Sequence, residues 1–347
     1  MLRSVALLLL SVVLSCPALG QAPASPTASS ESDALSTRRP VATYSIVARD
    51  SATGQLGVAV QSHWFSVGSI VPWAKPGVGA VATQSFVDPR YGPLGLELMA
   101  HGRTAEEALT ALVSTDDGRA VRQVAMVDAR GEVAAHTGEN AVGAAGHQTG
   151  AQYSVQANMM ANDDVWPAMA EAYETTDGDL AARLVAALEA AQAAGGDIRG
   201  KQSAALLVVR GDSATGQPWA DRLFDLRIED HATPVQELKR LLRMQRAYRQ
   251  LNAGDAHVTA GNIEAAMQNY QRAMEIVPDS ATNGEAPFWV GITLADQGRI
   301  DDALPYLRRA YRQHSDWATL VPRLPAAGLL ESEALAQQLV DAMTSNE

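Results

Sequence analysis

Hydrophobic and polar positions alternate with a period of two in several short segments from residue 43 onwards. Thr43 to Arg49 and Leu56 to Gln61 are two such segments, and Asp50 to Gln55 between them is rich in turn-forming residues. This pattern predicts a β-hairpin. The same alternation, or a run of small and β-branched residues, predicts further strands at 70–71, 78–85, 121–128, 133–137, 153–157, 203–209 and 223–228.

Apolar positions spaced three or four residues apart predict two pairs of helices between these strands. The first pair lies between Tyr91 and Thr115, where Thr104 to Glu107 forms a capping box, and the second covers 165–173 and 179–194. Consecutive hairpins indicate antiparallel sheets, and paired helices indicate layers outside them. We therefore predict an α+β domain over 43–232, a four-layer αββα sandwich of antiparallel sheets. A doubly wound parallel fold is disfavoured because its strands and helices would alternate singly.

The C-terminal region, 233–347, carries an internal repeat instead. Glycines and alanines recur after 37 residues: the second set, Gly291, Gly298, Ala303 and Ala310, matches Gly254, Gly261, Ala266 and Ala273. At the same spacing, Leu307 takes the place of Tyr270. This spacing is similar to the tetratricopeptide (TPR) pattern and predicts a small all-α domain of TPR-like helical repeats. Two repeats are few for a free-standing array, so we expect them to pack against a helix over 235–251 and a tail helix over 332–343.

The N-terminus has the three parts of a secretory signal peptide over residues 1–20: a positive start at Arg3, an apolar run, and a small-residue cleavage site. Residues 21–42, dominated up to Pro40 by Ala, Ser, Pro and Thr, are predicted to be a disordered leader or a propeptide. We therefore expect an exported protein, periplasmic or secreted. A lipoprotein anchored through Cys16 is disfavoured because Leu14 is bulky where a lipobox has a small residue.

Composition and charge argue against several classes of partner and ligand. The chain has 27 Lys and Arg against 39 Asp and Glu, a net charge of -12, which argues against nucleic acid as a partner. After the signal peptide no apolar run is long enough to span a membrane. The loop Gly195 to Lys201 has the spacing of a phosphate loop, but Gln202 replaces the magnesium-binding Ser or Thr, and the loop leads from a helix to a strand. No metal or cofactor is predicted.

Several motifs between Thr43 and His231 resemble a known family. They are Thr43 to Asp50, Gly57 to Val60, Val71 to Ala74, Gly77 to Gln84, Tyr91 to Pro93, Gly95 to Leu98, Ser154 to Gln156, Asn158-Met159, and Gln192 to Asp197 followed by Gln202 to Leu207. The segment resembles domain of unknown function 1028 (DUF1028), a family of uncharacterised proteins assigned to the N-terminal nucleophile (Ntn) hydrolases. That resemblance implies the αββα architecture that the order of elements also predicts. The repeat region is similar to a helical extension often attached to this domain and sometimes labelled peptidoglycan-binding.

The resemblance implies a nucleophile at Thr43. An Ntn hydrolase uses the first residue of its mature chain as nucleophile and that residue's own α-amine as base, and an α-amine with a pKa of about 7.7–8.0 can accept the hydroxyl proton near neutral pH. The bond between Ala42 and Thr43 must then be cut. The alternative is that Thr43 is an ordinary β-branched residue that opens a strand.

Polar residues at predicted strand ends are further candidates. Gln84 and Asn158 are predicted to act in catalysis by donating to a carbonyl oxygen or its oxyanion. The alternative is that these amides satisfy buried backbone groups. The predicted substrate-binding residues, which end the second strand or precede the strand at 203, are Ser62, His63, Lys201 and Gln202.

These inferences favour an exported hydrolase of a carbon–nitrogen (amide) bond that acts on a small-molecule or peptide amide without a cofactor. The alternative is a non-catalytic periplasmic binding or scaffold protein. In either case the helical repeats could engage a protein or peptidoglycan. The sequence leaves the substrate and the oligomeric state open.

Overall fold

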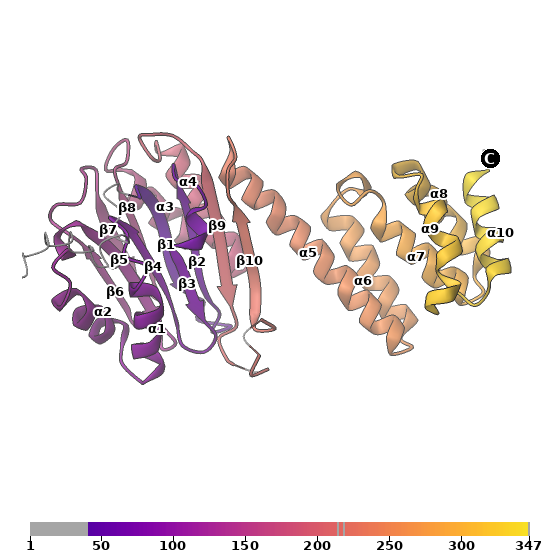
Figure 1. The fold of residues 1–347 in the computed structure, drawn as a ribbon, viewed down its shortest axis with the longest axis horizontal. Helices are drawn as coiled ribbons and strands as arrows, with labels where there is room; N and C mark the ends of the chain where they lie inside the picture. The colour runs from indigo at the N-terminus through magenta and orange to yellow at the C-terminus, as the bar shows by residue number, and fades with distance from the viewer. Residues whose placement is uncertain (1–40, 214, 218, 346–347) are drawn as a thin grey trace, which may run out of the picture. The chain divides into compact units, whose positions relative to one another are not determined.

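The computed structural model describes residues 41–213, 215–217 and 219–345 (Figure 1). The predicted signal peptide, Cys16 and the leader up to residue 40 lie outside the described residues. Two antiparallel sheets form the first part of the chain. The six-stranded sheet has the order β10-β9-β2-β1-β8-β7, and the four-stranded sheet has the order β3-β4-β5-β6.

The strands of the six-stranded sheet are β1 (Thr43–Arg49), β2 (Leu56–Ser62), β7 (Gly146–Gly150), β8 (Tyr153–Asn158), β9 (Ser203–Val209) and β10 (Arg222–Ile228). Those of the four-stranded sheet are β3 (Pro72–Lys75), β4 (Gly79–Ser85), β5 (Arg122–Asp128) and β6 (Val133–Thr137).

The two sheets pack face to face because alternate side chains of each strand point between them. Val47 of β1 and Val58 of β2 belong to one buried apolar cluster with Ala80 of β4 and Val127 of β5. The intervening residues of β1, such as Ile46, point the other way into a second buried cluster. Both faces of the six-stranded sheet are therefore covered, which explains the nearly continuous burial of β1 and β2.

Helices cover the outer faces of both sheets. Helices α1 (Tyr91–Ala100) and α2 (Ala105–Ser114) pack on the four-stranded sheet, and α3 (Val165–Thr175) and α4 (Leu180–Ala193) pack on the six-stranded sheet. The predicted capping box begins α2, where the Thr104 hydroxyl accepts the Glu107 amide at 3.0 Å and the Glu107 carboxylate accepts the Thr104 amide at 3.1 Å. The predicted α+β class with antiparallel sheets is thus confirmed.

Two strands differ from the prediction. β7 was not predicted, because its sequence Gly-His-Gln-Thr-Gly has no apolar alternation; it lies at the edge of its sheet and is mostly exposed. Ile70 and Val71 were predicted as a strand, but they follow the short 3₁₀ helix Val67–Ser69, and the strand β3 begins at Pro72. β3 is also an edge strand, where a proline without a backbone N–H is tolerated.

The C-terminal region consists of helices, as predicted. They are α5 (Pro234–Thr259), α6 (Ile263–Ile276), α7 (Glu285–Asp296), α8 (Ile300–Gln313), the short α9 (Trp317–Leu320) and α10 (Glu333–Thr344). The helix predicted over 235–251 continues to Thr259 without a break. Val235 and Leu242 of α5 belong to the buried cluster under the six-stranded sheet, whereas Leu251 belongs to a separate cluster of the helical region. Among the described residues, no helix combines the length and the apolar character needed to cross a membrane.

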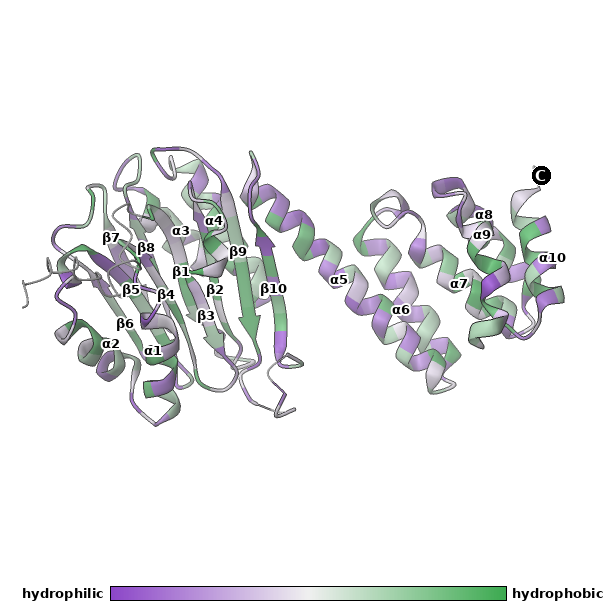
Figure 2. Cartoon of the chain, viewed as in Figure 1, coloured by the Kyte–Doolittle hydropathy of each residue, from purple (hydrophilic) through white to green (hydrophobic). Residues whose placement is uncertain are grey.

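The hydropathy of the residues reflects how many faces of an element are buried. In Figure 2, β9 is hydrophobic along most of its length, whereas hydrophilic and hydrophobic residues alternate along α5. A strand buried on both faces needs apolar residues throughout, but a helix with one covered face needs them only every three or four residues.

The internal repeat corresponds to two helix pairs, α5 with α6 and α7 with α8. A Cβ atom on Gly254 would lie 2.4 Å from the Tyr270 ring, and one on Gly291 would lie 2.6 Å from Leu307, so each glycine lets the two helices of its pair approach. Gly261 and Gly298, with φ of 75° and 74°, turn the chain between the helices of each pair. The repeated residues therefore make equivalent contacts.

A methyl group at Gly57 should destabilise the sandwich, because its Cβ would lie 2.6 Å from Leu184 Cδ1 of α4. We expect Gly57→Ala to lower the free energy of unfolding by about 1–3 kcal/mol and Leu184→Ala by about 2–5 kcal/mol. In urea unfolding, the double variant should lose less free energy of unfolding than the sum of the two single losses, because alanine at position 184 leaves space for the new methyl group at position 57. Gly143→Ala, which meets nothing within 4 Å, is the control. Strictly additive losses would contradict this packing.

Candidate functional site

The start of β1 meets the ends of two neighbouring strands. Thr43 lies opposite Ser62 of β2 on one side and Asn158 of β8 on the other. All three residues are fully buried. The structure therefore brings together Thr43 and two of the side chains predicted to act with it.

Gln84 and Asn158 both point at the main chain of Thr43. The Gln84 side-chain nitrogen lies 3.2 Å from the Thr43 carbonyl oxygen, and the Asn158 side-chain nitrogen lies 3.4 Å from the same oxygen. Gln84 reaches this atom from the four-stranded sheet, across the space between the sheets. The Thr43 hydroxyl donates to the carbonyl of Val41 at 2.8 Å.

A buried glutamine that sequence reasoning missed connects these amides. The Gln123 side-chain oxygen accepts from Gln84 at 2.7 Å and from Asn158 at 2.9 Å, and its nitrogen donates to the Thr137 hydroxyl at 2.9 Å. Gln123 is fully buried at the start of β5. A polar residue at an inward position of an otherwise apolar strand was the available signal.

Ser45 and Gln156 extend the same network along β1 and β8. The Gln156 nitrogen donates to the Ser45 hydroxyl at 2.6 Å, and this hydroxyl donates to the Gln84 oxygen at 2.6 Å. The space between the sheets is thus polar at the Thr43 end and apolar further along. The Asn158 oxygen has no hydrogen-bond partner among the described residues.

The carbonyl oxygen of Ala42 is held by two donors. The Ser62 hydroxyl and the Arg199 guanidinium both donate to it, the latter at 2.9 Å. Asp197 fixes Arg199 through a fork of two bonds, Nε to Oδ1 at 3.1 Å and Nη2 to Oδ2 at 2.8 Å, and its side chain is fully buried. A peptide carbonyl with a charged and a neutral donor is polarised toward nucleophilic attack.

Asp197 and Arg199 lie in the loop Gly195 to Lys201, of which only Lys201 was predicted to belong to the site. Gly195 and Gly196 both have positive φ, 126° and 63°, and lead the chain from the end of α4 into this loop. A residue with a Cβ atom would be strained at these positive φ values. The two glycines therefore position the arginine rather than a ligand phosphate.

The other predicted substrate-binding residues lie further from Thr43. The His63 side chain is exposed, and only its backbone amide joins the site, by donating to Asp197 at 2.9 Å. Lys201 is exposed, and Gln202 is half-buried. In the part of the chain that the structure describes, no hydrogen bond or ion pair joins the side chain of His63, Lys201 or Gln202 to Thr43.

The end of the leader is part of the folded body. Val41 donates its amide to the Ser85 carbonyl at 2.6 Å and accepts the Ser85 amide at 3.1 Å, which links β1 to the four-stranded sheet. Val41 and Ala42 are both fully buried. Residues 41 and 42 of the predicted leader or propeptide are therefore folded, because Val41 packs in the apolar core between the sheets.

Tyr44 faces the helices on the other side of the six-stranded sheet. Its hydroxyl donates to the Gln192 side chain at 3.2 Å. Burial raises the pKa of this hydroxyl well above its usual value, and the nearby Asp197 carboxylate raises it further. Tyr44 therefore stays protonated at neutral pH. Among the described residues, no group of three or more His, Cys, Asp and Glu side chains could hold a metal ion.

Comparisons with known proteins agree on the first domain. The model of DUF1028, described as a family of unknown function, matches residues 43–238. The chain is similar to the crystal structure of protein SPO2555 from Silicibacter pomeroyi, also assigned to DUF1028, with 32% identity and a TM-score of 0.52 over 58% of this chain and 88% of that one. No curated protein shows a significant match.

Replacing Gln123 should destabilise the folded chain. Gln123→Ala removes the acceptor of two buried amides and leaves a cavity, so we expect the free energy of unfolding to fall by about 2–4 kcal/mol. Gln268→Ala, an exposed glutamine of α6, should change it by less than about 0.5 kcal/mol. Chemical denaturation measures both, and an equal, small effect of the two would show that the network carries little stability.

Proposed function

The chain belongs to DUF1028, a family of unknown function, and we propose that it is the precursor of an exported Ntn hydrolase that cleaves a carbon–nitrogen bond with Thr43 as nucleophile. The observation that carries this proposal is the environment of the bond before Thr43. The Ala42 carbonyl is held by Ser62 and Arg199, directly beside a buried threonine hydroxyl.

The precursor then cuts itself. The Thr43 hydroxyl oxygen attacks the carbonyl carbon of Ala42, and the negative charge that develops on the carbonyl oxygen is stabilised by Ser62 and Arg199. The Ala42–Thr43 C–N bond breaks as an ester forms between Ala42 and the Thr43 side chain, and the hydroxyl proton passes to the departing Thr43 nitrogen. Water hydrolyses this ester, which releases the Ala42 carboxylate and leaves Thr43 with a free α-amine.

Burial supports an intramolecular cut over cleavage by a second protease. Val41, Ala42 and Thr43 have no exposed surface in the folded chain. A protease must bind several residues around its target bond in an extended form, and this segment is paired with Ser85 and Ser62 instead. A hydroxyl already inside the fold reaches the bond without unfolding.

After cleavage the same groups serve a substrate. The free α-amine, with a pKa of about 7.7–8.0, accepts the Thr43 hydroxyl proton. Ser62 and Arg199, released from Ala42, can bind the substrate carbonyl. The Thr43 oxygen forms an acyl ester as the substrate C–N bond breaks and the leaving amine takes the proton from the α-ammonium group, and water then hydrolyses the ester. Gln84 and Asn158 act by positioning the Thr43 backbone, since both donate to its carbonyl.

The architecture supports this assignment. Two stacked antiparallel sheets between helical layers agree with an Ntn-type αββα sandwich, and the equivalent Gly254–Tyr270 and Gly291–Leu307 contacts agree with TPR-like repeats. We propose export on the signal-peptide pattern of residues 1–20, and a protein or peptidoglycan partner for the repeats.

The alternative function is a non-catalytic binding or scaffold protein. The Val41–Ser85 bridge favours it, because the uncut leader completes the core between the sheets and removing it would expose apolar surface. The amide network around Gln123 also has a structural use without catalysis. In this case the Ala42–Thr43 bond stays intact.

Replacing the proposed nucleophile should stop processing. Wild-type protein purified from the envelope should begin at Thr43, as measured by N-terminal sequencing and intact mass. Thr43→Ala should retain the leader because it lacks the attacking oxygen, whereas Thr43→Ser should still be cut.

Thr83→Ala is a matched control, because Thr83 is also a fully buried threonine whose hydroxyl donates to a backbone carbonyl, that of Asp88 at 3.0 Å. It should be processed normally. A native N-terminus upstream of Thr43 in wild-type protein would refute the enzyme and support the scaffold. Normal processing of Thr43→Ala would refute cleavage by the Thr43 hydroxyl.

Removing a donor to the Ala42 carbonyl should slow the cut without abolishing it. We expect Ser62→Ala to reduce the processing rate about a hundredfold. Arg199→Lys should also slow it, because lysine cannot reproduce the two-bond fork with Asp197. The rate is followed by mass spectrometry after refolding. Ser203→Ala removes the neighbouring buried hydroxyl, which donates to the Trp64 carbonyl, and should leave the rate unchanged.

A further inference from the structure

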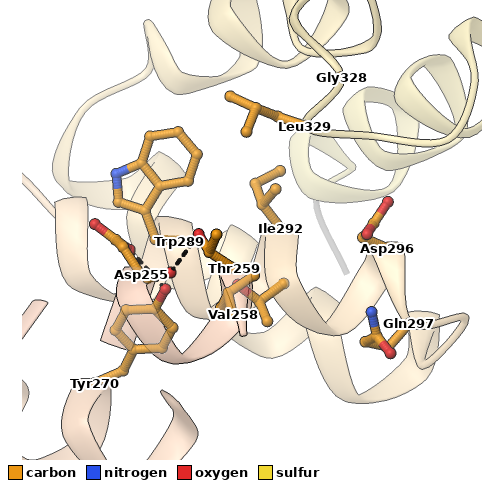
Figure 3. Close-up of a pocket in the computed structure, with 11 residues that line it drawn as sticks. Asp255, Val258, Thr259, Tyr270, Trp289, Ile292, Asp296, Gln297, Gly328 and Leu329 are labelled. Atoms are coloured by element: carbon orange, nitrogen blue, oxygen red, sulfur yellow. Dashed lines mark hydrogen bonds between the residues drawn. The ribbon is translucent and has the colours of Figure 1, made fainter. Parts of the chain in front are cut away.

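A cavity opens between the helices of the C-terminal region. It has a volume of about 340 Å³ and lies between α5, α6, α7 and the loop at Gly328 and Leu329 (Figure 3). Trp289, Ile292 and Leu329 supply apolar walls, and Leu329 is 47% exposed. A concave, partly apolar space with a few polar groups is typical of a ligand site.

The charged groups of this cavity are all acidic. Asp255 of α5 and Asp296 of α7 line it, and none of its 11 lining residues is Lys, Arg or His. Within the described residues, neither carboxylate takes part in an ion pair. The Tyr270 hydroxyl donates to one oxygen of Asp255 at 2.7 Å, which orients this carboxylate and leaves its second oxygen as an acceptor.

The aromatic wall is also fixed in place. Trp289 is half-buried and packs edge to face on Phe288, with ring centroids 5.1 Å apart. An indole held beside carboxylates attracts a cation through its ring face as well as through the charges. Trp289 and the acidic residues therefore both favour a cationic ligand.

The repeat allows the polar pair Asp255 and Tyr270 to be compared with its equivalent in the second helix pair. Asp255 and Tyr270 of the first helix pair correspond to Ile292 and Leu307 of the second, at the same spacing of 37 residues. Leu307 contacts Gly291 as Tyr270 contacts Gly254, without any polar partner. An apolar pair thus suffices in the second repeat, whereas in the first the buried Tyr270 hydroxyl uses one oxygen of Asp255 and leaves the second oxygen as an acceptor in the cavity.

We propose that this cavity binds an organic cation on an apolar stem, with its ammonium or guanidinium group at the second oxygen of the Asp255 carboxylate and its stem against Trp289. The group belongs either to a Lys or Arg side chain of a partner protein or to a free diamine. The site is independent of the proposed hydrolase.

The test is titration of the full chain with Nα-acetyl-lysine methylamide, Nα-acetyl-arginine methylamide and 1,5-diaminopentane, followed by calorimetry and tryptophan fluorescence. We expect saturable binding with a Kd on the order of 1 mM, as for a single side chain. Binding should weaken when salt screens the carboxylates. Preference for the blocked amino acids assigns the site to a protein partner, and preference for the diamine assigns it to a small molecule.

Variants identify the cavity as the site. Asp255→Asn and Trp289→Leu should each weaken binding by about tenfold or more. Asp301→Asn makes the same charge change at an exposed residue of α8 that does not line the cavity, and should have no effect. The uncharged analogue Nα-acetyl-norleucine methylamide should not bind. Equal binding of this analogue, equal weakening by Asp301→Asn, or no saturation by any of the three cations would overturn the proposal, and circular dichroism checks that each variant is folded.

Discussion

The side chain of Gln123 joins the two sheets at the end where Thr43 lies. Its oxygen accepts one amide from β4 in its own sheet and one from β8 in the facing sheet, and both of these amides also donate to Thr43. A buried amide that loses its partner costs about 1–3 kcal/mol, so a mutually satisfied group of amides permits few other arrangements. This network therefore holds the Thr43 backbone in addition to the strand pairing with β2 and β8.

That constraint explains why the end of the leader is ordered. With Thr43 fixed between β2 and β8, the preceding residues can leave only across the gap toward the four-stranded sheet, where Val41 pairs with Ser85. Ala42 then lies between Ser62 and Arg199 and has no contact with water. This geometry agrees with both functions proposed above. The Ala42–Thr43 bond is cut in the hydrolase and stays intact in the scaffold protein.

Periodicity in the sequence predicted most strands and helices because burial of one or both faces leaves a direct pattern. It missed β7, whose residues are exposed, and it predicted Ile70 and Val71 as a strand, because two apolar residues in a loop look like a short strand. For the candidate site, Thr43, Ser62, Gln84 and Asn158 could be grouped because each stands at a strand end. Gln123 also stands near a strand end and left such a signal, which was missed. Arg199 and Asp197 could not be grouped with them, because the path of a glycine turn has no periodic signal.

His63 shows how a one-residue step changes such a prediction. Ser62 is the partner of Thr43 in the register of β1 and β2, so His63 lies beyond the pair, where its side chain turns out to solvent. A hairpin prediction without its register could not separate the two residues. In the helical region this ambiguity does not arise, because the repeat of 37 residues shows which positions of the two helix pairs are equivalent. Gly254 and Gly291 fix equivalent helix contacts, and against that background Asp255 stands out as a carboxylate where the second helix pair has Ile292.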